Sequence, residues 1–362
     1  MRSKAAALSA LMISLALLAG CTLTQDEPGE RAENVAQQAP APSARVPENE
    51  PVARVASQVA PSVVQVNVQA VQETPFGTQE GEGVGSGVIY RRDGFVITNN
   101  HVVEGASEVN VAFADGTTEQ GEVVGTDPAT DLAVVRVDGR DLPAASFRES
   151  ADLVVGQLAV AVGSPSGFQS TVTSGVVSGV GREVPAELTG GRQETALVDL
   201  IQTDAAISPG SSGGALANRD GEVVGINVAY LPPAETGAES IGFAIPTYTA
   251  TAVADQLIEN GEAVGPYMGV SLTDLAPETA RRFGVEAESG ALVAEVEPDG
   301  PAAMAGIQAG DVVTALGEQE VRGSGDLLSA LRRYVPGDRV EVTVLRDGAE
   351  ERVNLRLGEH AG

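Results

Sequence analysis

The sequence predicts a mainly β protein in which a large domain of barrels or sandwiches precedes a smaller α+β domain. Glycine is abundant, with 43 of 362 residues, and aromatic residues make up only 3%, a composition that favours strands and tight turns. Short apolar runs separated by turns continue from residue 63 to residue 246, and the pattern changes after Pro266. A chain of this length has room for two or three domains.

The N-terminus has the features of a secretion signal. Arg2 and Lys4 precede an apolar run at 5–19, which ends in Leu-Ala-Gly before Cys21. The run is shorter than the roughly 20 residues of a comfortable membrane span. Its ending resembles the bacterial lipobox, in which the cysteine is acylated and becomes the first residue. We therefore expect residues 1–20 to be a lipoprotein signal peptide and Cys21 to carry the lipid; an uncleaved anchor is the alternative.

Residues 21–52 are rich in Pro, Ala, Gln and Glu and show no periodicity. This composition is typical of a disordered tether. The tether would hold the folded part away from the membrane, and a pro-segment is the alternative.

The large domain is predicted from its strands and turns. Asp-Gly pairs at 93–94, 115–116, 138–139 and 220–221 mark turns between apolar runs. A helix is expected over 247–260, where apolar residues recur at helical spacing and Gly261 stands at the cap position. The expected strands are 63–68, 87–90, 95–98, 109–113, 122–125, 132–137, 158–162, 176–180, 214–217, 223–228 and 242–245.

Three motifs of this domain complement one another chemically. His101 ends an apolar strand, Asp131 opens another strand, and Ser212 lies in a turn rich in glycine and serine at 208–215. Each motif alone is weak evidence, but a hydroxyl nucleophile needs a base, and the base needs an orienting carboxylate. The order His, Asp, Ser is that of the chymotrypsin-type double barrel. The sequence therefore predicts the catalytic triad His101, Asp131 and Ser212.

The segments 98–103, 130–134, 203–214 and 241–246 resemble those of the HtrA (high temperature requirement, or Deg) serine proteases. The resemblance runs from about residue 53 to the C-terminus. It implies a chymotrypsin-like double β-barrel at 53–262, followed by a PDZ domain at 263–362. The chain departs from the family at Ser208, Ser211 and Ala215, where the family usually has Asn, Asn and Pro; none of these is a catalytic group.

The resemblance also implies the rest of the protease site. The backbone N–H groups of Gly210 and Ser212 would form the oxyanion hole. Ala206, six residues before the nucleophile, would line the base of the specificity pocket, and Ile207 would narrow it. The strand residues Ile226, Asn227 and Val228 would pair with an extended substrate. An apolar pocket predicts cleavage after Val, Ala, Leu or Ile in unfolded proteins.

The C-terminal region carries a second expected binding site. A strand is expected to start at 267–270, and further strands are expected at 291–296, 340–345 and 352–357, with helices at 277–283 and 325–334. In a PDZ domain, the loop that captures a peptide's C-terminal carboxylate would fall at Tyr267, Met268, Gly269 and Val270, and the peptide would add a strand to the sheet. A packed α+β domain without a ligand is the alternative.

Several function classes are excluded by composition. The formal net charge of −28 repels nucleic acid and anionic membrane surfaces. Lys4 is the only lysine, so a Walker-type phosphate loop cannot be built. Two histidines are too few for a multi-histidine metal site, and a lone Cys21 allows no internal disulfide. We expect no metal, nucleotide or other cofactor.

The expected function follows from the triad and the resemblance. It is that of an ATP-independent serine endopeptidase of extracytoplasmic protein quality control, attached to a bacterial membrane through its lipid. Expected partners are unfolded or misfolded proteins and C-terminal peptides, and the resemblance implies a homo-oligomer, a trimer. A non-proteolytic chaperone or a PDZ-based peptide sensor is the alternative.

Overall fold

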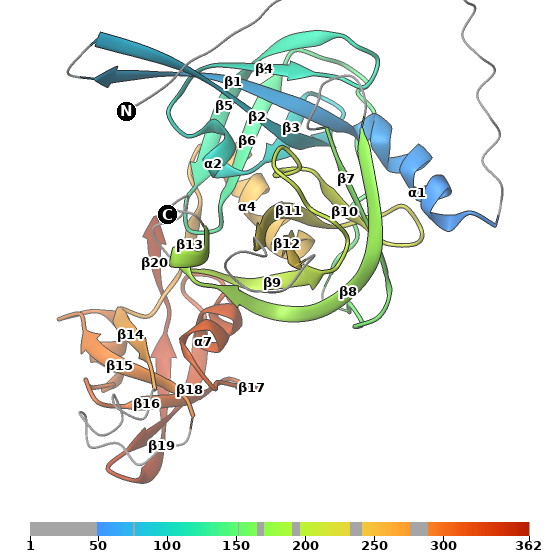
Figure 1. The fold of residues 1–362 in the computed structure, drawn as a ribbon. Helices are drawn as coiled ribbons and strands as arrows, with labels where there is room; N and C mark the ends of the chain where they lie inside the picture. The colour runs from blue at the N-terminus through green and yellow to red at the C-terminus, as the bar shows by residue number, and fades with distance from the viewer. Residues whose placement is uncertain are drawn as a thin grey trace, which may run out of the picture. The chain divides into compact units, whose positions relative to one another are not determined.

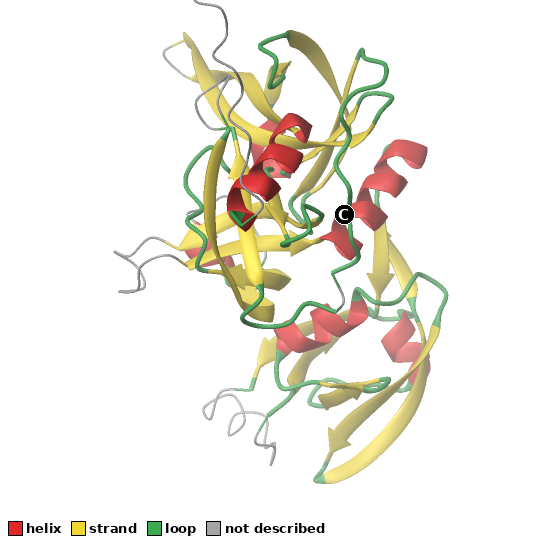
Figure 2. Cartoon of the chain, turned by 90° about the vertical axis from the view of Figure 1, so that its right-hand side faces the viewer, coloured by secondary structure: helices red, strands yellow, loops and turns green. Residues whose placement is uncertain are grey.

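A computed structural model describes residues 49–74, 77–150, 152–164, 170–189, 196–231, 241–275 and 289–361. Cys21 and the helix expected at 277–283 lie outside these residues. Strands dominate the described part of the chain (Figure 2).

Two closed barrels form the first part of the fold (Figure 1). The first has the strand order β1-β2-β3-β6-β5-β4, and the second has the order β10-β11-β12-β9-β8-β7. Closure removes the unpaired edges that an open sheet would expose. The first barrel contains β1 (Val63–Thr74), β2 (Gly77–Arg91), β3 (Phe95–Thr98), β4 (Ala106–Ala112), β5 (Thr118–Asp127) and β6 (Leu132–Val137), with the one-turn helix α2 (Asn100–Val103). The second contains β7 (Leu158–Gly163), β8 (Thr171–Val184), β9 (Leu197–Thr203), β10 (Ala215–Ala217), β11 (Val223–Leu231) and β12 (Ile241–Pro246), with the 3-10 turn η2 (Ala186–Thr189).

The barrels share a core as well as having their own. One cluster of buried side chains combines Val88 and Ile97 of the first barrel with Val160 and Ile226 of the second. Burying apolar surface stabilises the fold by about 25 cal/mol per Å² removed from water. A common core therefore holds the barrel junction together, and this junction is where the candidate site lies.

Two helices pack on this shared core. The helix α4 (Thr247–Asn260) coincides with the predicted helix and ends at Gly261, whose φ of 79° provides the left-handed cap. The helix α1 (Pro51–Val59) was not predicted; it buries Val55 and Val59 and is followed by the 3-10 turn η1 (Ala60–Ser62). The helix α1 therefore includes residues 51 and 52, the last two of the segment expected to be a tether. The signal for α1, a proline at the first helical position before spaced valines, was present in the sequence.

The C-terminal part is an α+β body. Its main sheet has the order β14-β15-β16-β18-β19, with β17 beside β16, and β13 pairs separately with β20. Within the described residues, β14 is therefore an edge strand. Its elements are β13 (Val264–Tyr267), β14 (Val270–Asp274), β15 (Ala291–Val296), α6 (Pro301–Ala305), β16 (Val312–Leu316), β17 (Gln319–Glu320), α7 (Ser324–Leu331), β18 (Arg339–Arg346), β19 (Ala349–Arg356) and β20 (Gly358–Ala361).

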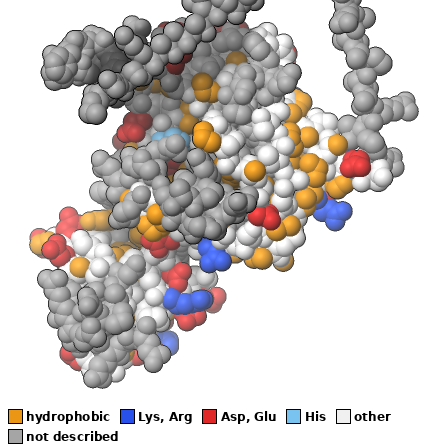
Figure 3. Space-filling view, in the orientation of Figure 1, with side chains coloured by type: hydrophobic (Ala, Val, Ile, Leu, Met, Phe, Trp, Pro, Cys, Tyr) orange, Lys and Arg blue, Asp and Glu red, His pale blue; other side chains and the backbone are white. Residues whose placement is uncertain are grey.

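Two sequence predictions for this body need correction. The strand expected to start at 267–270 is interrupted at Met268 and Gly269, between the end of β13 at Tyr267 and the start of β14 at Val270, because Gly269 has a φ of 76° and turns the chain. The helix α7 ends at Leu331, three residues before the expected end, and a short turn follows it. On the face drawn in Figure 3, acidic side chains are scattered over this body, and apolar side chains gather over the barrels.

Candidate active site

His101 and Asp131, 30 residues apart in sequence, lie in contact. His101 Nδ1 is 2.7 Å from Asp131 Oδ2, and the backbone N–H of His101 donates to Asp131 Oδ1 at 3.0 Å. The side chain of Asp131 is 1% exposed and that of His101 is 13% exposed. Both carboxylate oxygens therefore bind the histidine residue, one orienting its ring and the other fixing its backbone, while the ring keeps an edge near solvent.

The local backbone explains why Asp131 points this way. Asp131 has a φ of 58°, in the left-handed region that Asp tolerates better than most residues. Its carbonyl accepts from the side-chain amide of Asn99 at 2.9 Å and from the N–H of Asn100 at 3.1 Å. Asp127 braces the turn by accepting from the Thr130 hydroxyl. The turn before β6 and the start of α2 are therefore joined independently of the histidine ring.

Ser212 lies in a tight turn before β10 in which some backbone N–H groups donate hydrogen bonds and others do not. The N–H groups of Ser211, Gly213 and Gly214 donate to carbonyl oxygens at 2.8–3.0 Å. Among the described residues, the N–H groups of Gly210 and Ser212 donate to no partner. Gly210 has a φ of 88° and Gly213 of 84°, conformations that favour glycine. The loop thus leaves unpaired the two N–H groups expected to form the oxyanion hole.

The hydroxyl of Ser212 donates to the carbonyl of Val228 at 3.3 Å. In the part of the chain that the structure describes, no hydrogen bond joins Ser212 to His101. Attack on a carbonyl would require the Ser212 hydroxyl to leave Val228 and donate to the imidazole instead.

The residues expected to bind substrate are those of the specificity pocket, Ala206 and Ile207, and those of the strand expected to pair with substrate, Ile226, Asn227 and Val228. Ala206 is exposed, and Ile207 is buried beside Gly242. Asp204 turns away from this position, accepting from the Val176 N–H at 2.6 Å. Val228 is skipped by an irregularity in the pairing of β11 with β12.

Ile226 and Asn227 were wrongly expected to pair with substrate. Ile226 pairs with Ala215 on one side and with Ile245 on the other, and its side chain is in the core. The N–H and carbonyl of Asn227 are both bonded to the nucleophile turn, at Gly214 and Gly213. Since barrel closure uses both edges of the strand here, only Val228 remains a prediction for substrate pairing.

The loop expected to bind a carboxylate also has free donors. The carbonyls of Met268 and Gly269 accept from the N–H groups of Ala302 and Glu297, at 2.8 and 2.9 Å. Among the described residues, the N–H groups of Met268 and Gly269 have no partner. Among the described strands, β14 pairs only with β15, so the arrangement can accept an added strand that ends in an anion.

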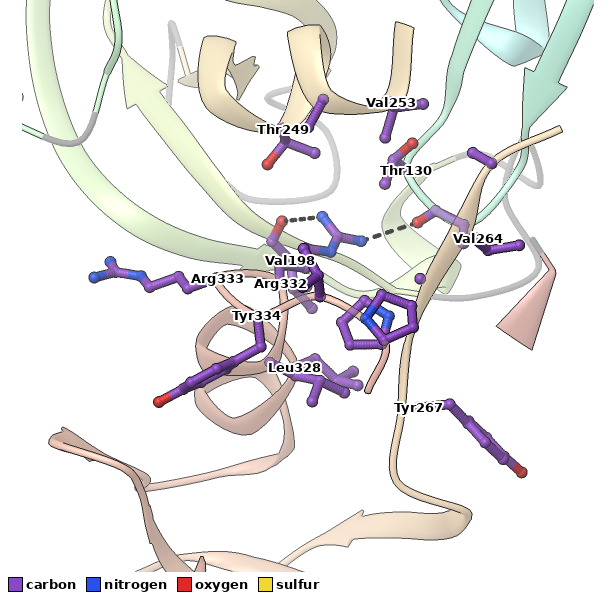
Figure 4. Close-up of a pocket in the computed structure, with 18 of the residues that line it drawn as sticks. Thr130, Val198, Thr249, Val253, Val264, Tyr267, Leu328, Arg332, Arg333 and Tyr334 are labelled. Atoms are coloured by element: carbon purple, nitrogen blue, oxygen red, sulfur yellow. Dashed lines mark hydrogen bonds between the residues drawn. The ribbon is translucent and has the colours of Figure 1, made fainter. Parts of the chain in front are cut away.

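A cavity of about 790 Å³ lies beside this loop (Figure 4). Arg332, which follows α7, extends into it and donates through Nη1 to the Val198 carbonyl and through Nη2 to the Ala129 carbonyl, both at 3.0 Å. Ala129 is two residues before Asp131 in sequence. Burial lowers the pKa of Arg332, while the charges of Asp199 and Asp127 oppose this change.

The buried Asp199 and the partly buried Tyr248 form a hydrogen-bonded pair next to Arg332. The Tyr248 hydroxyl donates to Asp199 Oδ2. Burial raises the pKa of Asp199, although the Tyr248 bond and the charges of Arg332 and Arg333 act in the opposite direction. Burial and the Asp199 charge also raise the pKa of Tyr248, which keeps it a hydrogen-bond donor.

Sequence reasoning missed two residues of the site. Arg332 gave no signal, because an arginine after a helix is ordinarily solvated. Ser86 lies in β2 and contacts the nucleophile turn; glycines at 85 and 87 on either side of it were the only available sign. No helix among the described residues is both long enough and apolar enough to span a membrane.

Comparisons with known proteins agree with this geometry. Residues 85–226 match the trypsin-like peptidase domain family, and residues 266–357 match the PDZ domain family. The chain is 42% identical over 282 residues to a probable periplasmic serine endoprotease, DegP-like, of Halomonas elongata, covering 78% of this chain and 58% of that protein. It is 38% identical over 327 residues to the serine protease Do-like HtrB of Bacillus subtilis, covering 84% of this chain and 70% of the relative.

Solved structures give the same result. The HtrA-type protease AlgW with decapeptide superposes with a TM-score of 0.67 at 35% identity, covering 85% of this chain and 98% of AlgW. A serine endoprotease from Yersinia pestis superposes with a TM-score of 0.59 at 30% identity, covering 87% of this chain and 99% of that one. The described fold, two barrels followed by an α+β body, is the one shared by these proteins.

Proposed function

Because this chain belongs to the HtrA family of serine proteases, we propose that it is a serine endopeptidase in which Ser212 is the nucleophile, His101 the general base and Asp131 the orienting carboxylate. The observation that carries the proposal is the junction itself. One barrel supplies a buried carboxylate bonded to a histidine, and the other supplies a serine in a turn with two N–H groups that find no partner in the described part of the chain. The chain spans 58% of the length of the H. elongata relative, so activity and substrates are inferred from this site.

The proposed mechanism starts once the Ser212 hydroxyl has left the Val228 carbonyl and donates to the His101 imidazole. Ser212 transfers its proton to His101 as its oxygen attacks a peptide carbonyl, and Asp131 stabilises the imidazolium. The N–H groups of Gly210 and Ser212 donate hydrogen bonds to the carbonyl oxygen of the substrate and stabilise the negative charge that develops on it. His101 then protonates the leaving amine, and water releases the acyl group.

The substrates we propose are unfolded proteins cut after small or aliphatic residues. Ala206 and Ile207 place no charge in the expected pocket, and Asp204, the nearest carboxylate in sequence, faces β8. A buried guanidinium without a partner is unfavourable by several kcal/mol, so cleavage after Arg should be rare.

The test is digestion of denatured casein by the purified chain and by Ser212→Ala, with the cut sites mapped by mass spectrometry. Wild type should cut mainly after Val, Ala, Leu or Ile, and Ser212→Ala should be inactive. An active Ser212→Ala protein would contradict the assignment of Ser212 as the nucleophile. A folded, inactive wild type that still suppresses casein aggregation would favour the chaperone alternative, and cuts mainly after Arg would show that the pocket is misplaced.

We further propose that the protein works outside the cytoplasm, held to a membrane by a lipid on Cys21. Relatives named periplasmic proteases support the compartment, and the lipobox-like ending at 18–21 supports the lipid. Labelling with radioactive palmitate in a bacterial host should be lost in Cys21→Ser; equal labelling of both proteins would refute the anchor.

A further inference from the structure

One buried serine joins the two barrels at the nucleophile turn. Ser86 lies in β2 of the first barrel and is 0% exposed. Its hydroxyl donates to the carbonyl of Gly210 at 2.6 Å and accepts from the N–H of Ser164 at 2.8 Å. Its own N–H donates to the carbonyl of Ser212 at 2.7 Å. Its carbonyl accepts from the Thr98 hydroxyl at 2.7 Å. The three polar groups of this residue, its N–H, its carbonyl and its hydroxyl, therefore make four hydrogen bonds.

Two peptide planes of the turn are each held at the carbonyl by Ser86 and at the N–H by another residue. The plane between Gly210 and Ser211 has its carbonyl bound by the Ser86 hydroxyl and its N–H bound by the Ser208 carbonyl. The plane between Ser212 and Gly213 has its carbonyl bound by the Ser86 N–H and its N–H bound by the Asn227 carbonyl. The plane that carries the N–H of Ser212 lies between these two, and its own carbonyl, that of Ser211, accepts from the Gly214 N–H at 3.0 Å. Its direction therefore depends on this bond and on the two flanking planes.

The turn also approaches Ser86 too closely for any side chain to intervene. A Cβ placed on Gly213 would collide with the Ser86 carbonyl, and the φ of 84° at this position already disfavours other residues. Gly210 is the other donor of the expected oxyanion hole, and it has a φ of 88°. Glycine adopts this conformation easily but also leaves it easily, so the direction of the Gly210 N–H is not fixed by the residue itself. An external bond is needed to select that conformation.

We propose that Ser86 is a positioning residue for acyl transfer: its hydroxyl, supplied by the first barrel, fixes the orientation of the Gly210 and Ser212 N–H groups of the second. This rests on the proposed role of Ser212 as the nucleophile. A fixed donor is worth more than a mobile one, because no reorganisation is needed as charge develops on the carbonyl oxygen.

The test compares Ser86→Ala with Ser150→Ala. Ser150 is also buried, 5% exposed, and its hydroxyl accepts from the Thr247 backbone N–H at 3.0 Å, away from the nucleophile turn. Both variants lose one buried hydroxyl, so both should lose about 2–4 °C in Tm. The rate of phosphonylation of Ser212 by a fluorophosphonate and the kcat for a peptide taken from the casein map should fall about 10- to 100-fold in Ser86→Ala alone, with KM little changed.

A third variant separates positioning from folding. Ser86→Cys keeps the side-chain length and a weak donor, so its rates should lie between those of wild type and Ser86→Ala. Rates in Ser86→Ala equal to those in Ser150→Ala would overturn the inference. If Ser86→Ala unfolds at the assay temperature, a Ser86→Cys protein that matches Ser150→Ala would overturn it equally. Absence of fluorophosphonate labelling on Ser212 in wild type would instead contradict the proposed nucleophile.

Discussion

Asp199 shows how much a single buried carboxyl group can affect this fold. It has a φ of 63° and accepts a hydrogen bond from Tyr248, yet burial raises its pKa. A carboxyl group whose pKa is higher in the folded state contributes stability that is fully present below its unfolded pKa of about 3.9. That contribution is lost as pH rises through the folded pKa.

Asp199→Asn should therefore stabilise the protein at neutral pH. Asparagine does not ionise, it still accepts from Tyr248, and it tolerates the left-handed backbone. The Tm of the variant should exceed that of wild type at pH 7, and the difference should shrink as pH falls toward 4. Calorimetry from pH 4 to pH 8 measures this.

Asp115→Asn is the control, because the pKa of Asp115 is shifted in the direction opposite to that of Asp199. Hydrogen bonds from Thr117 lower the pKa of Asp115, so its contribution is present above the unfolded pKa and is lost on acidification. Any effect of that variant should be a loss of Tm that disappears in acid. A pH-independent difference for Asp199→Asn would contradict our account of its burial.

At the scale of elements, α7 is the helix through which the C-terminal body contacts the barrels. It packs against β8 and β9, and Arg332 follows its last turn. The two carbonyls that Arg332 binds belong to β9 and to the turn that leads to Asp131. A helix of eight residues is marginal in isolation, so such contacts hold it in place.

Arg332→Ala should lower Tm and loosen α7. Its removal leaves the Val198 carbonyl without its donor, which costs about 1–3 kcal/mol, while the Ala129 carbonyl lies near solvent and can be hydrated. Hydrogen exchange of the α7 amides should become faster, as measured by mass spectrometry. Arg333→Ala, which changes the exposed neighbour, should leave exchange unchanged. Equal exchange in the two variants would show that Arg332 does not anchor the helix.

At the scale of the whole molecule, one chain carries both the candidate protease site and the loop expected to bind a peptide carboxylate. We predict that peptides with a free C-terminal carboxylate bind at the Met268–Gly269 N–H groups and along β14, at least tenfold more tightly than the same peptides amidated. Titration calorimetry on the full chain would give both dissociation constants.

A pair of glycine variants locates that binding. Gly269→Ala places a side chain at a φ of 76° in the loop and should weaken binding, whereas Gly265→Ala has open space around it and should not. Equal affinity for free and amidated peptides, or equal loss in both variants, would remove the carboxylate site.

The sequence by itself determined the parts whose signals are local. Asp-Gly turns and alternating apolar runs placed strands such as 95–98, 132–137 and 291–296, which the structure confirms, because side-chain alternation and turn chemistry act over a few residues. The mainly β, double-barrel fold with a PDZ domain and the membership of the serine protease family are also confirmed. The roles of His101, Asp131 and Ser212 were inferred from residue chemistry and stay predictions.

Only the tertiary structure decided which groups have partners. Ile226 and Val228 belong to one strand and look alike in sequence, but barrel closure pairs the first on both sides and leaves the second at an irregularity. Ser86 and Gly210 are 124 residues apart, and Arg332 and Ala129 are 203 apart, yet each pair is bonded. Such contacts depend on strand register and on how whole elements pack, and neither is encoded in any short stretch of the chain.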